Sequence, residues 1–237
     1  MWQKSRSYLT IILLIFLFGC NDSKTTKKKT EKKTVTTLEE TKKLPDTIVE
    51  KEPEPFLLTK ENAIDFFFQY GKENTEDKVK VTTDFGSFVI QLYDKTPYHR
   101  ANFIYLTKKE YFNNTYFHRV VPNFIIQGGN SDNKETSQKR RAIGRYLLPP
   151  DTKKGYKHHR GTVSMPSSDI NNPYKLASPF EFFIVTTKPG SYHLDGDYTA
   201  FGRVIQGMNV VDEINKQPID EGEYPIQNIK MQVEIVE

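Results

Sequence analysis

Cysteine is almost absent from this sequence, and long hydrophobic runs are missing. The 237 residues include a single cysteine, Cys20, so no disulfide can form within the chain. The apolar run 8–18 spans eleven residues and would make about 16 Å of helix, roughly half the hydrocarbon thickness of a membrane. The run is therefore too short to span a membrane and has the length of the hydrophobic part of a signal peptide.

The part of the chain with the composition of a folded domain carries little net charge. The whole chain has a formal charge of +4. Lys4 and Arg6 contribute two positive charges and residues 21–44 contribute four more, which leaves the part from Pro45 onward at −2. A slightly acidic domain lacks the basic face that binds nucleic acid, so we expect no nucleic-acid partner.

The usual signs of a metal, cofactor or phosphate site are also missing. His158 and His159 are adjacent, so on a strand their side chains point to opposite faces, and no cysteine or acidic cluster flanks them. Gly128-Gly129 lacks the spacing and the following helix of a phosphate-binding loop. We therefore expect neither a metal nor a cofactor.

The N-terminus has the features of a lipoprotein signal. A basic start precedes the apolar run, which ends in Leu17-Phe18-Gly19-Cys20, and the sequence then turns strongly polar. This end resembles the lipobox of bacterial lipoproteins, although Phe18 is bulkier than the residue usual there. We expect a signal peptide at 1–19, a lipid on Cys20, and anchoring to a membrane of the bacterial envelope, on the periplasmic side or at the outer membrane. The alternative is an apolar segment with an incidental cysteine.

Two further segments precede the main domain. Residues 20–58 are rich in Lys, Thr, Glu and Pro, which predicts a disordered tether. Residues 59–77 are predicted to hold a short helix, begun by Thr59 and ended by Gly71, and a linker. The Phe66-Phe67-Phe68 run of this helix would dock on the main domain, and ligand binding is the alternative role.

From Lys78 onward the hydrophobic pattern is that of β-strands. Apolar and polar residues alternate across 79–92. Further strands are predicted at 116–120, 124–127, 162–165, 182–186, 200–204 and 229–235. Two helices are predicted, one opening at Thr96-Pro97 and one at 208–214. Many short strands without a βαβ alternation indicate a closed antiparallel β-barrel, and the polar stretch 131–161 is too long for an ordinary hairpin loop.

Five motifs in this region resemble those of the cyclophilins, in the same order. They are Pro97…Asn102-Phe103, FHRVVPNFIIQGG at 117–129, GTVSM at 161–165, EFFI at 181–184, and LDG at 194–196 followed by FGRV at 201–204. The resemblance covers 78–237. It implies a mainly β fold, an eight-stranded antiparallel closed barrel capped by two α-helices, and catalysis of peptidyl-prolyl cis-trans isomerisation.

The resemblance also implies catalytic roles for Arg119 and Gln127. Arg119 matches the family's catalytic arginine, whose permanently charged guanidinium would donate to the proline nitrogen in the twisted transition state. Gln127 matches the residue that orients this arginine and the substrate. Positions eight apart on one strand face the same way, but the turn at Pro122-Asn123 means that the spacing only permits this pairing.

Apolar residues of the same motifs match the pocket that grips the proline ring. They are Phe124, Ile125, Phe183 and Leu194, and ordinary barrel core is the alternative for each. Phe182 serves as a control, because strand alternation places it opposite Phe183. We therefore assign Phe182 to the core and Phe183 to the pocket.

Several predicted substrate-binding positions depart from the family pattern. Glu181 replaces a glutamine, and its carboxylate would either orient Arg119 or compete for it. His193 stands in place of a tryptophan that contacts cyclosporin in animal relatives, which predicts weak inhibition by that compound. Tyr198 stands where animal enzymes have histidine, and the insertion 169–179 would lengthen a loop beside the groove.

The sequence as a whole predicts a monomeric envelope foldase that acts on Pro-containing polypeptides, among them exported and envelope proteins. One alternative is a cyclophilin-like module that binds Pro-containing segments without turnover, and another is a structural envelope lipoprotein. The joint presence of Arg119, Phe124, Gln127 and Phe183 favours the enzyme, because binding alone does not require that arginine.

Overall fold

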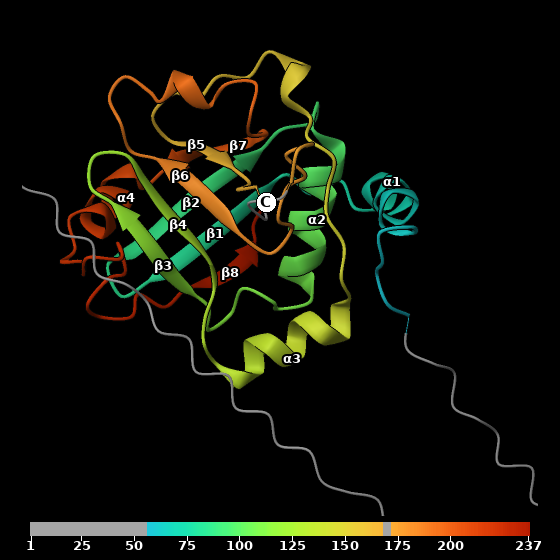
Figure 1. The fold of residues 1–237 in the computed structure, drawn as a ribbon, viewed down its shortest axis with the longest axis horizontal. Helices are drawn as coiled ribbons and strands as arrows, with labels where there is room; N and C mark the ends of the chain where they lie inside the picture. The colour runs from blue at the N-terminus through green and yellow to red at the C-terminus, as the bar shows by residue number, and fades with distance from the viewer. Residues whose placement is uncertain (1–55, 168–171) are drawn as a thin grey trace, which may run out of the picture. The chain divides into compact units, whose positions relative to one another are not determined.

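The computed structural model describes residues 56–167 and 172–237, which Figure 1 draws in colour. The predicted signal peptide, Cys20 and nearly all of the predicted tether lie outside these residues. The helices of the described ranges are α1 (Ala63–Glu73), α2 (Pro97–Lys108), α3 (Lys134–Ile143), α4 (Met208–Asn215) and the 3-10 helices η1 (Thr152–Lys154) and η2 (Tyr192–Leu194). None of the helices in these ranges is both long and apolar enough to cross a membrane.

In the described ranges, eight strands form one antiparallel sheet. They are β1 (Lys78–Thr83), β2 (Gly86–Leu92), β3 (Tyr116–Val121), β4 (Ile125–Asn130), β5 (Thr162–Ser164), β6 (Phe182–Val185), β7 (Ala200–Gln206) and β8 (Gln232–Ile235). Their order across the sheet is β3-β4-β6-β5-β7-β2-β1-β8. Figure 1 shows the sheet curled, with α2 and α4 on opposite sides of the strands. The predicted mainly β, eight-stranded antiparallel fold is confirmed.

The barrel is less closed than the sequence predicted. The ladder ends at β3 and β8, and in the described chain an isolated bridge between Tyr116 and Lys230 joins the two edges. Backbone hydrogen bonds from Phe117 N to Ile229 O and from Met231 N to Thr115 O, both 2.9 Å, extend this contact. The sheet is therefore a curled barrel that is only partly closed. Residues 229–231, which lie just before β8, make the contact with the start of β3, and β8 itself does not pair with β3.

A cluster of aromatic rings lies in the interior of the curled sheet, among a larger number of buried aliphatic side chains. Phe103 of α2 packs edge-on against Phe182 of β6, with ring centroids 5.4 Å apart, and also contacts Phe201 of β7 at 5.5 Å. Phe182 is fully buried in this cluster, which confirms its assignment to the core. Aromatic side chains remove large apolar areas from water, so this cluster holds α2 against the sheet.

The helix α1 docks on α2 through the triple-phenylalanine run. Phe66 and Phe67 both pack edge-on against Tyr105 of α2, with ring centroids at 5.2 and 5.8 Å. Phe67 is buried, whereas Phe68 is 48% exposed and lies beneath the Lys72 ammonium group. The predicted docking is thus confirmed for two of the three rings.

The bounds of α1 differ from the prediction at both ends. The helix begins at Ala63 and not at Thr59, and it continues past Gly71 to Glu73. A Cβ at Gly71 would lie 3.2 Å from the Cβ of Ala101 in α2. Gly71 therefore serves the close approach of the two helices and does not end α1.

The polar stretch 131–161 contains α3, a helix that the sequence did not reveal. Within α3 only Thr136 and Ile143 are buried, so no wide apolar stripe marks it in the sequence. Next to its end, Leu58 is fully buried, with its N–H on Ile143 O at 2.9 Å and its carbonyl accepting from Arg145 N at 2.8 Å. Leu58 thus belongs to the folded unit, and the predicted tether extends too far.

Candidate active site

The β3–β4 hairpin brings the two predicted catalytic residues together. Arg119 on β3 is the direct cross-strand partner of Gln127 on β4, and Gln127 is in turn the partner of Phe183 on β6. Phe183 lies opposite Ser164 on β5. Directly opposed residues point to the same face of a sheet, so these four side chains form one row across four strands. The hairpin register supplies the pairing that the sequence spacing only permitted.

An apolar cavity lies beside this row. Ile125, Phe183, Val185 and Leu194 form a buried cluster that is separate from the main core. The cavity has a volume of about 300 Å³ and is lined by Arg119, Phe124, Ile125, Gln127, Pro166, Ser167, Phe183, Leu194 and Tyr198. Seven of these were predicted site residues. Pro166 and Ser167 were not, because their place in the wall depends on how the chain leaves β5.

His193 and Glu181, the other predicted substrate-binding residues, do not line the cavity. His193 is exposed and stacks on the ring of Phe124, with centroids 5.5 Å apart and planes at 23°. It therefore supports one wall of the cavity from outside. Glu181 lies next to the row, just before β6, and contacts it through Gln127.

Glu181 is bound by three side chains, and Arg119 is not one of them. The Gln127 Nε2 group donates to its carboxylate at 3.0 Å, while His118 Nε2 and Arg140 Nη2 each lie 3.6 Å away. Burial raises the pKa of Glu181, but the neighbouring His118 and Arg140 side chains and the hydrogen bond from Gln127 together outweigh it and leave the pKa below its usual value. The expected contact with Arg119 is thus replaced by one with Gln127.

The guanidinium of Arg119 pairs instead with Glu223. Its Nε and Nη2 atoms both lie 2.7 Å from Oε2 of Glu223. Glu223 belongs to the segment between α4 and β8, 104 positions away in the sequence. No motif marked this residue, because its contact with Arg119 arises only when that segment packs on β3.

A buried histidine, His158, contacts two residues of the row beside the cavity, Ser164 and Phe183. His158 Nδ1 lies 2.7 Å from Asp195 Oδ1, and its Nε2 lies 2.9 Å from the Ser164 hydroxyl. Burial lowers the pKa of His158 below its usual value, which favours a neutral ring with Nδ1–H donating to Asp195 and Nε2 accepting from Ser164. The ring also stacks on Phe183, with centroids 6.2 Å apart.

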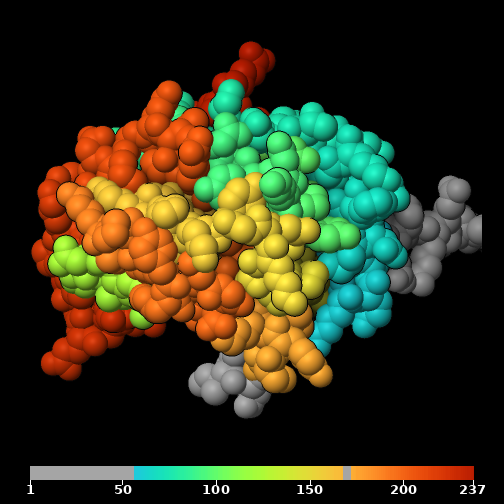
Figure 2. Space-filling model, turned by 90° about the horizontal axis from the view of Figure 1, so that it is seen from above, coloured from blue at the N-terminus to red at the C-terminus, as the bar shows by residue number. Residues whose placement is uncertain are grey.

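This histidine joins two segments that lie side by side. Ser191 N donates to His158 O at 2.7 Å. Figure 2 shows yellow and orange segments of the chain in contact on one face of the molecule. Asp195 follows Leu194, a residue of the cavity wall, so the histidine ties that wall to the row on the sheet. From the sequence, the only role considered for His158 was that of a metal ligand, and no metal site was expected.

Comparison with known proteins agrees with this geometry. The family model described as cyclophilin-type peptidyl-prolyl cis-trans isomerase matches residues 78–235, about two thirds of the chain. The chain belongs to the cyclophilin family. Members of this family catalyse cis-trans isomerisation at X-Pro bonds, so this cyclophilin is a peptidyl-prolyl isomerase.

Individual relatives cover the cyclophilin domain to different extents. A peptidyl-prolyl cis-trans isomerase of Acinetobacter baylyi is 35% identical over 142 residues, which are 59% of this chain and 72% of the relative. One of Arabidopsis thaliana is 32% identical over 161 residues, 67% of this chain and 93% of the relative. Peptidyl-prolyl cis-trans isomerase-like 2 of Rhizopus delemar is 34% identical over 166 residues, but the match spans only 30% of that longer protein.

Solved structures show the same fold. The crystal structure of a Cryptosporidium parvum cyclophilin-type isomerase matches with a TM-score of 0.58 and 26% identity, over 68% of this chain and 98% of that one. A second structure of that protein, obtained in the presence of the dipeptide Ala-Pro, matches with a TM-score of 0.57.

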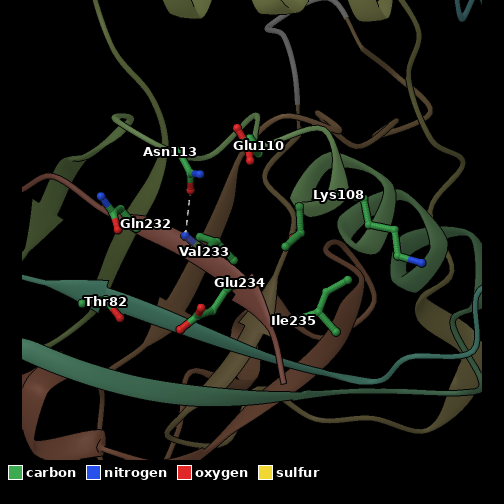
Figure 3. Close-up of a pocket in the computed structure, with 9 residues that line it drawn as sticks. Thr82, Lys108, Glu110, Asn113, Gln232, Val233, Glu234 and Ile235 are labelled. Carbon is green, nitrogen blue, oxygen red and sulfur yellow. Dashed lines mark hydrogen bonds between the residues drawn. The ribbon is translucent and has the colours of Figure 1, made fainter. Parts of the chain in front are cut away.

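A larger cavity lies elsewhere on the cyclophilin domain. Figure 3 shows it between the end of α2 and β8. Its volume is about 410 Å³. Val233 N donates to Asn113 Oδ1 at 3.0 Å across it. Its lining contains neither the paired arginine and glutamine nor the apolar cluster, so size alone does not identify the active site of this protein.

Proposed function

We propose that Arg119 is the catalytic residue of this isomerase, that Gln127 orients it, and that the apolar cavity holds the proline ring of the substrate. One observation carries the proposal: the guanidinium and the carboxamide are cross-strand neighbours at the wall of an apolar cavity of about 300 Å³. A proline ring is apolar and carries no N–H, so it suits the surface formed by Ile125, Phe183 and Leu194.

The chemistry needs little more than a donor placed beside this cavity. Rotation about the X-Pro bond meets a barrier of about 18–20 kcal/mol, because the C–N bond has partial double-bond character. In the twisted transition state that conjugation is lost and the proline nitrogen regains a lone pair. An Arg119 N–H directed at this nitrogen binds the twisted state better than either planar isomer, which lowers the barrier.

Gln127 completes the arrangement through its fixed amide. Its NH₂ group donates to Glu181, since a carboxylate can only accept. Its carbonyl oxygen is then the group that it offers to a donor such as the Arg119 guanidinium or a substrate N–H. Glu181 thereby acts on the site through Gln127.

We further propose that this isomerase acts in the bacterial envelope, anchored by a lipid on Cys20. The short apolar run, the Leu17-Phe18-Gly19-Cys20 end and the polar sequence after it support the anchor. Its substrates would then be Pro-containing segments of exported or envelope proteins, and it would act as a monomer.

The catalytic assignment is tested by a protease-coupled isomerisation assay on residues 21–237. Removal of a single transition-state donor typically costs about 10²–10³ in rate, so we expect Arg119→Ala to lose at least a hundredfold in kcat/KM. Arg203→Ala, which removes an exposed arginine of β7, is the matched control and should keep full activity. Unchanged turnover in Arg119→Ala would refute the assignment. An inactive wild type that still binds Pro-containing peptides would indicate a binding module.

A further inference from the structure

The pairing of Arg119 with Glu223 uses one edge of the guanidinium and leaves the other edge open. The Nε and Nη2 atoms share a single carboxylate oxygen at 2.7 Å each. A guanidinium carries five N–H groups in one plane, and the two on Nη1 take no part in this contact. The same side chain lines the apolar cavity. The paired edge therefore fixes the plane of the guanidinium, while the remaining donors stay available to a substrate.

The Glu223 carboxylate lies on a turn that is held by side-chain hydrogen bonds. Glu223 has a φ of +65°, in the left-handed region that residues with a side chain rarely adopt. One oxygen of Asp220 accepts from both Gly222 N and Tyr224 N, each at 2.9 Å, and so holds the turn closed around Glu223. A strained conformation of this kind persists only where its surroundings enforce it.

The turn is also docked on the strand that carries the arginine. Val120 N donates to Glu223 O at 2.9 Å, and Val120 directly follows Arg119 on β3. β3 is an edge strand, so this hydrogen bond uses a backbone group that the sheet leaves unpaired. The position of the Glu223 carboxylate is therefore set by backbone contacts next to the residue it binds.

We propose that Glu223 is a positioning residue that fixes the Arg119 guanidinium for catalysis. The inference rests on the proposed catalytic role of Arg119. The pair is partly exposed, with 40% of the arginine side chain and 37% of the glutamate side chain accessible. Without Glu223 the arginine would sample rotamers that point away from the cavity, and each turnover would begin from a smaller fraction of competent molecules.

The test compares Glu223→Gln and Glu223→Ala with a control on the same turn, in residues 21–237. The amide of glutamine can accept one hydrogen bond without the charge, so we expect about a threefold loss of kcat/KM for Glu223→Gln and about tenfold for Glu223→Ala, which corresponds to about 1.4 kcal/mol. The loss should fall on kcat and leave KM nearly unchanged. Glu221→Gln removes an equal charge from an exposed neighbour and should retain full activity.

A spectroscopic readout separates positioning from a general loosening of the fold. The Arg119 Nε–H group should give a protected ¹⁵N NMR signal in the wild type, and the signal should be lost in Glu223→Ala while the backbone amide spectrum is kept. Adding Glu223→Ala to Arg119→Ala should cost no further activity, because the glutamate acts only through the arginine.

Four results would overturn the inference. Glu223→Ala could leave turnover unchanged. It could also raise turnover, which would mean that Glu223 competes with the substrate for Arg119. It could also lower activity equally in the presence and absence of Arg119, which would indicate a structural effect of the turn. If instead Arg119→Ala itself is fully active, the catalytic assignment fails and this inference fails with it, so the two failures are distinguished by the arginine variant.

Discussion

Glu181 illustrates how much a single residue depends on which neighbour it reaches. The sequence placed its carboxylate against Arg119, but the carboxylate accepts from Gln127 and lies 3.6 Å from both His118 and Arg140. A carboxylate can only accept hydrogen bonds, so it fixes which end of the Gln127 amide faces it. The glutamine usual in the family can accept or donate and does not fix that orientation.

This contact predicts a tuned activity in Glu181→Gln. A hydrogen bond to a charged group is worth about 1 kcal/mol more than a neutral one, so we expect kcat/KM to fall by about fivefold and not to vanish. Protease-coupled assays and peptide binding measure turnover and affinity separately. Glu234→Gln, which removes a carboxylate paired with Lys80 on the far edge of the sheet, is the control. The prediction is wrong if Glu181→Gln changes neither turnover nor affinity.

Residues of the site differed in how far the sequence could predict them. Phe182 and Phe183 followed from strand alternation, because a strand turns successive side chains to opposite faces regardless of what surrounds it. The partners of Glu181 and the pairing of Arg119 with Glu223 could not be predicted, because they depend on packing between segments far apart in the chain. Local patterns determine the face of a side chain, and tertiary contacts determine its partner.

The same distinction holds for whole elements. The strands were predicted from alternation, whereas α3 was missed because it buries only two side chains. Gly71 was taken as a helix end, a common role for glycine, but it serves the contact of α1 with Ala101. A strand with alternating apolar and polar residues can be recognised from the sequence. A helix that buries few side chains, or a glycine that allows two helices to approach closely, cannot.

The helix α2 carries a buried histidine that makes stability depend on pH. His99 is fully buried, neither ring nitrogen has a hydrogen-bond partner in the described structure, and burial lowers its pKa to about 3. Between this value and the ordinary 6.5 the unfolded chain binds a proton that the folded chain does not. The free energy of unfolding is therefore highest above pH 6.5 and falls as the pH is lowered.

Chemical unfolding of the wild type and His99→Leu at pH 7.5 and pH 4.5 measures this effect. Two pH units below 6.5 correspond to about 2.7 kcal/mol, so the wild type should lose about that much more stability than the variant. At pH 7.5 the variant should be at least as stable, because leucine has no unpaired nitrogen to bury. Equal losses in the two proteins would show that His99 does not titrate in this way. His158, whose pKa is also lowered, contributes to both and cancels in the comparison.

At the scale of the whole molecule, the active site and the proposed anchor are separate in the sequence. Every residue that lines the cavity lies between Arg119 and Tyr198, and the family match begins at residue 78. The proposed lipid would be attached at Cys20, which belongs to neither. Catalysis and localisation should therefore respond to different substitutions.

Cys20→Ser tests this separation in bacterial cells that express the full chain. The variant should fail to incorporate labelled palmitate and should leave the membrane fraction, because serine cannot accept the thioether-linked lipid, while the turnover of each molecule stays at the wild-type level. Ser23→Ala, three residues further on, should keep both the label and the membrane association. Labelling that persists in Cys20→Ser would exclude this cysteine as the anchor. A loss of turnover along with the lipid would instead show that the N-terminal segment contributes to the site, which the position of the cavity residues argues against.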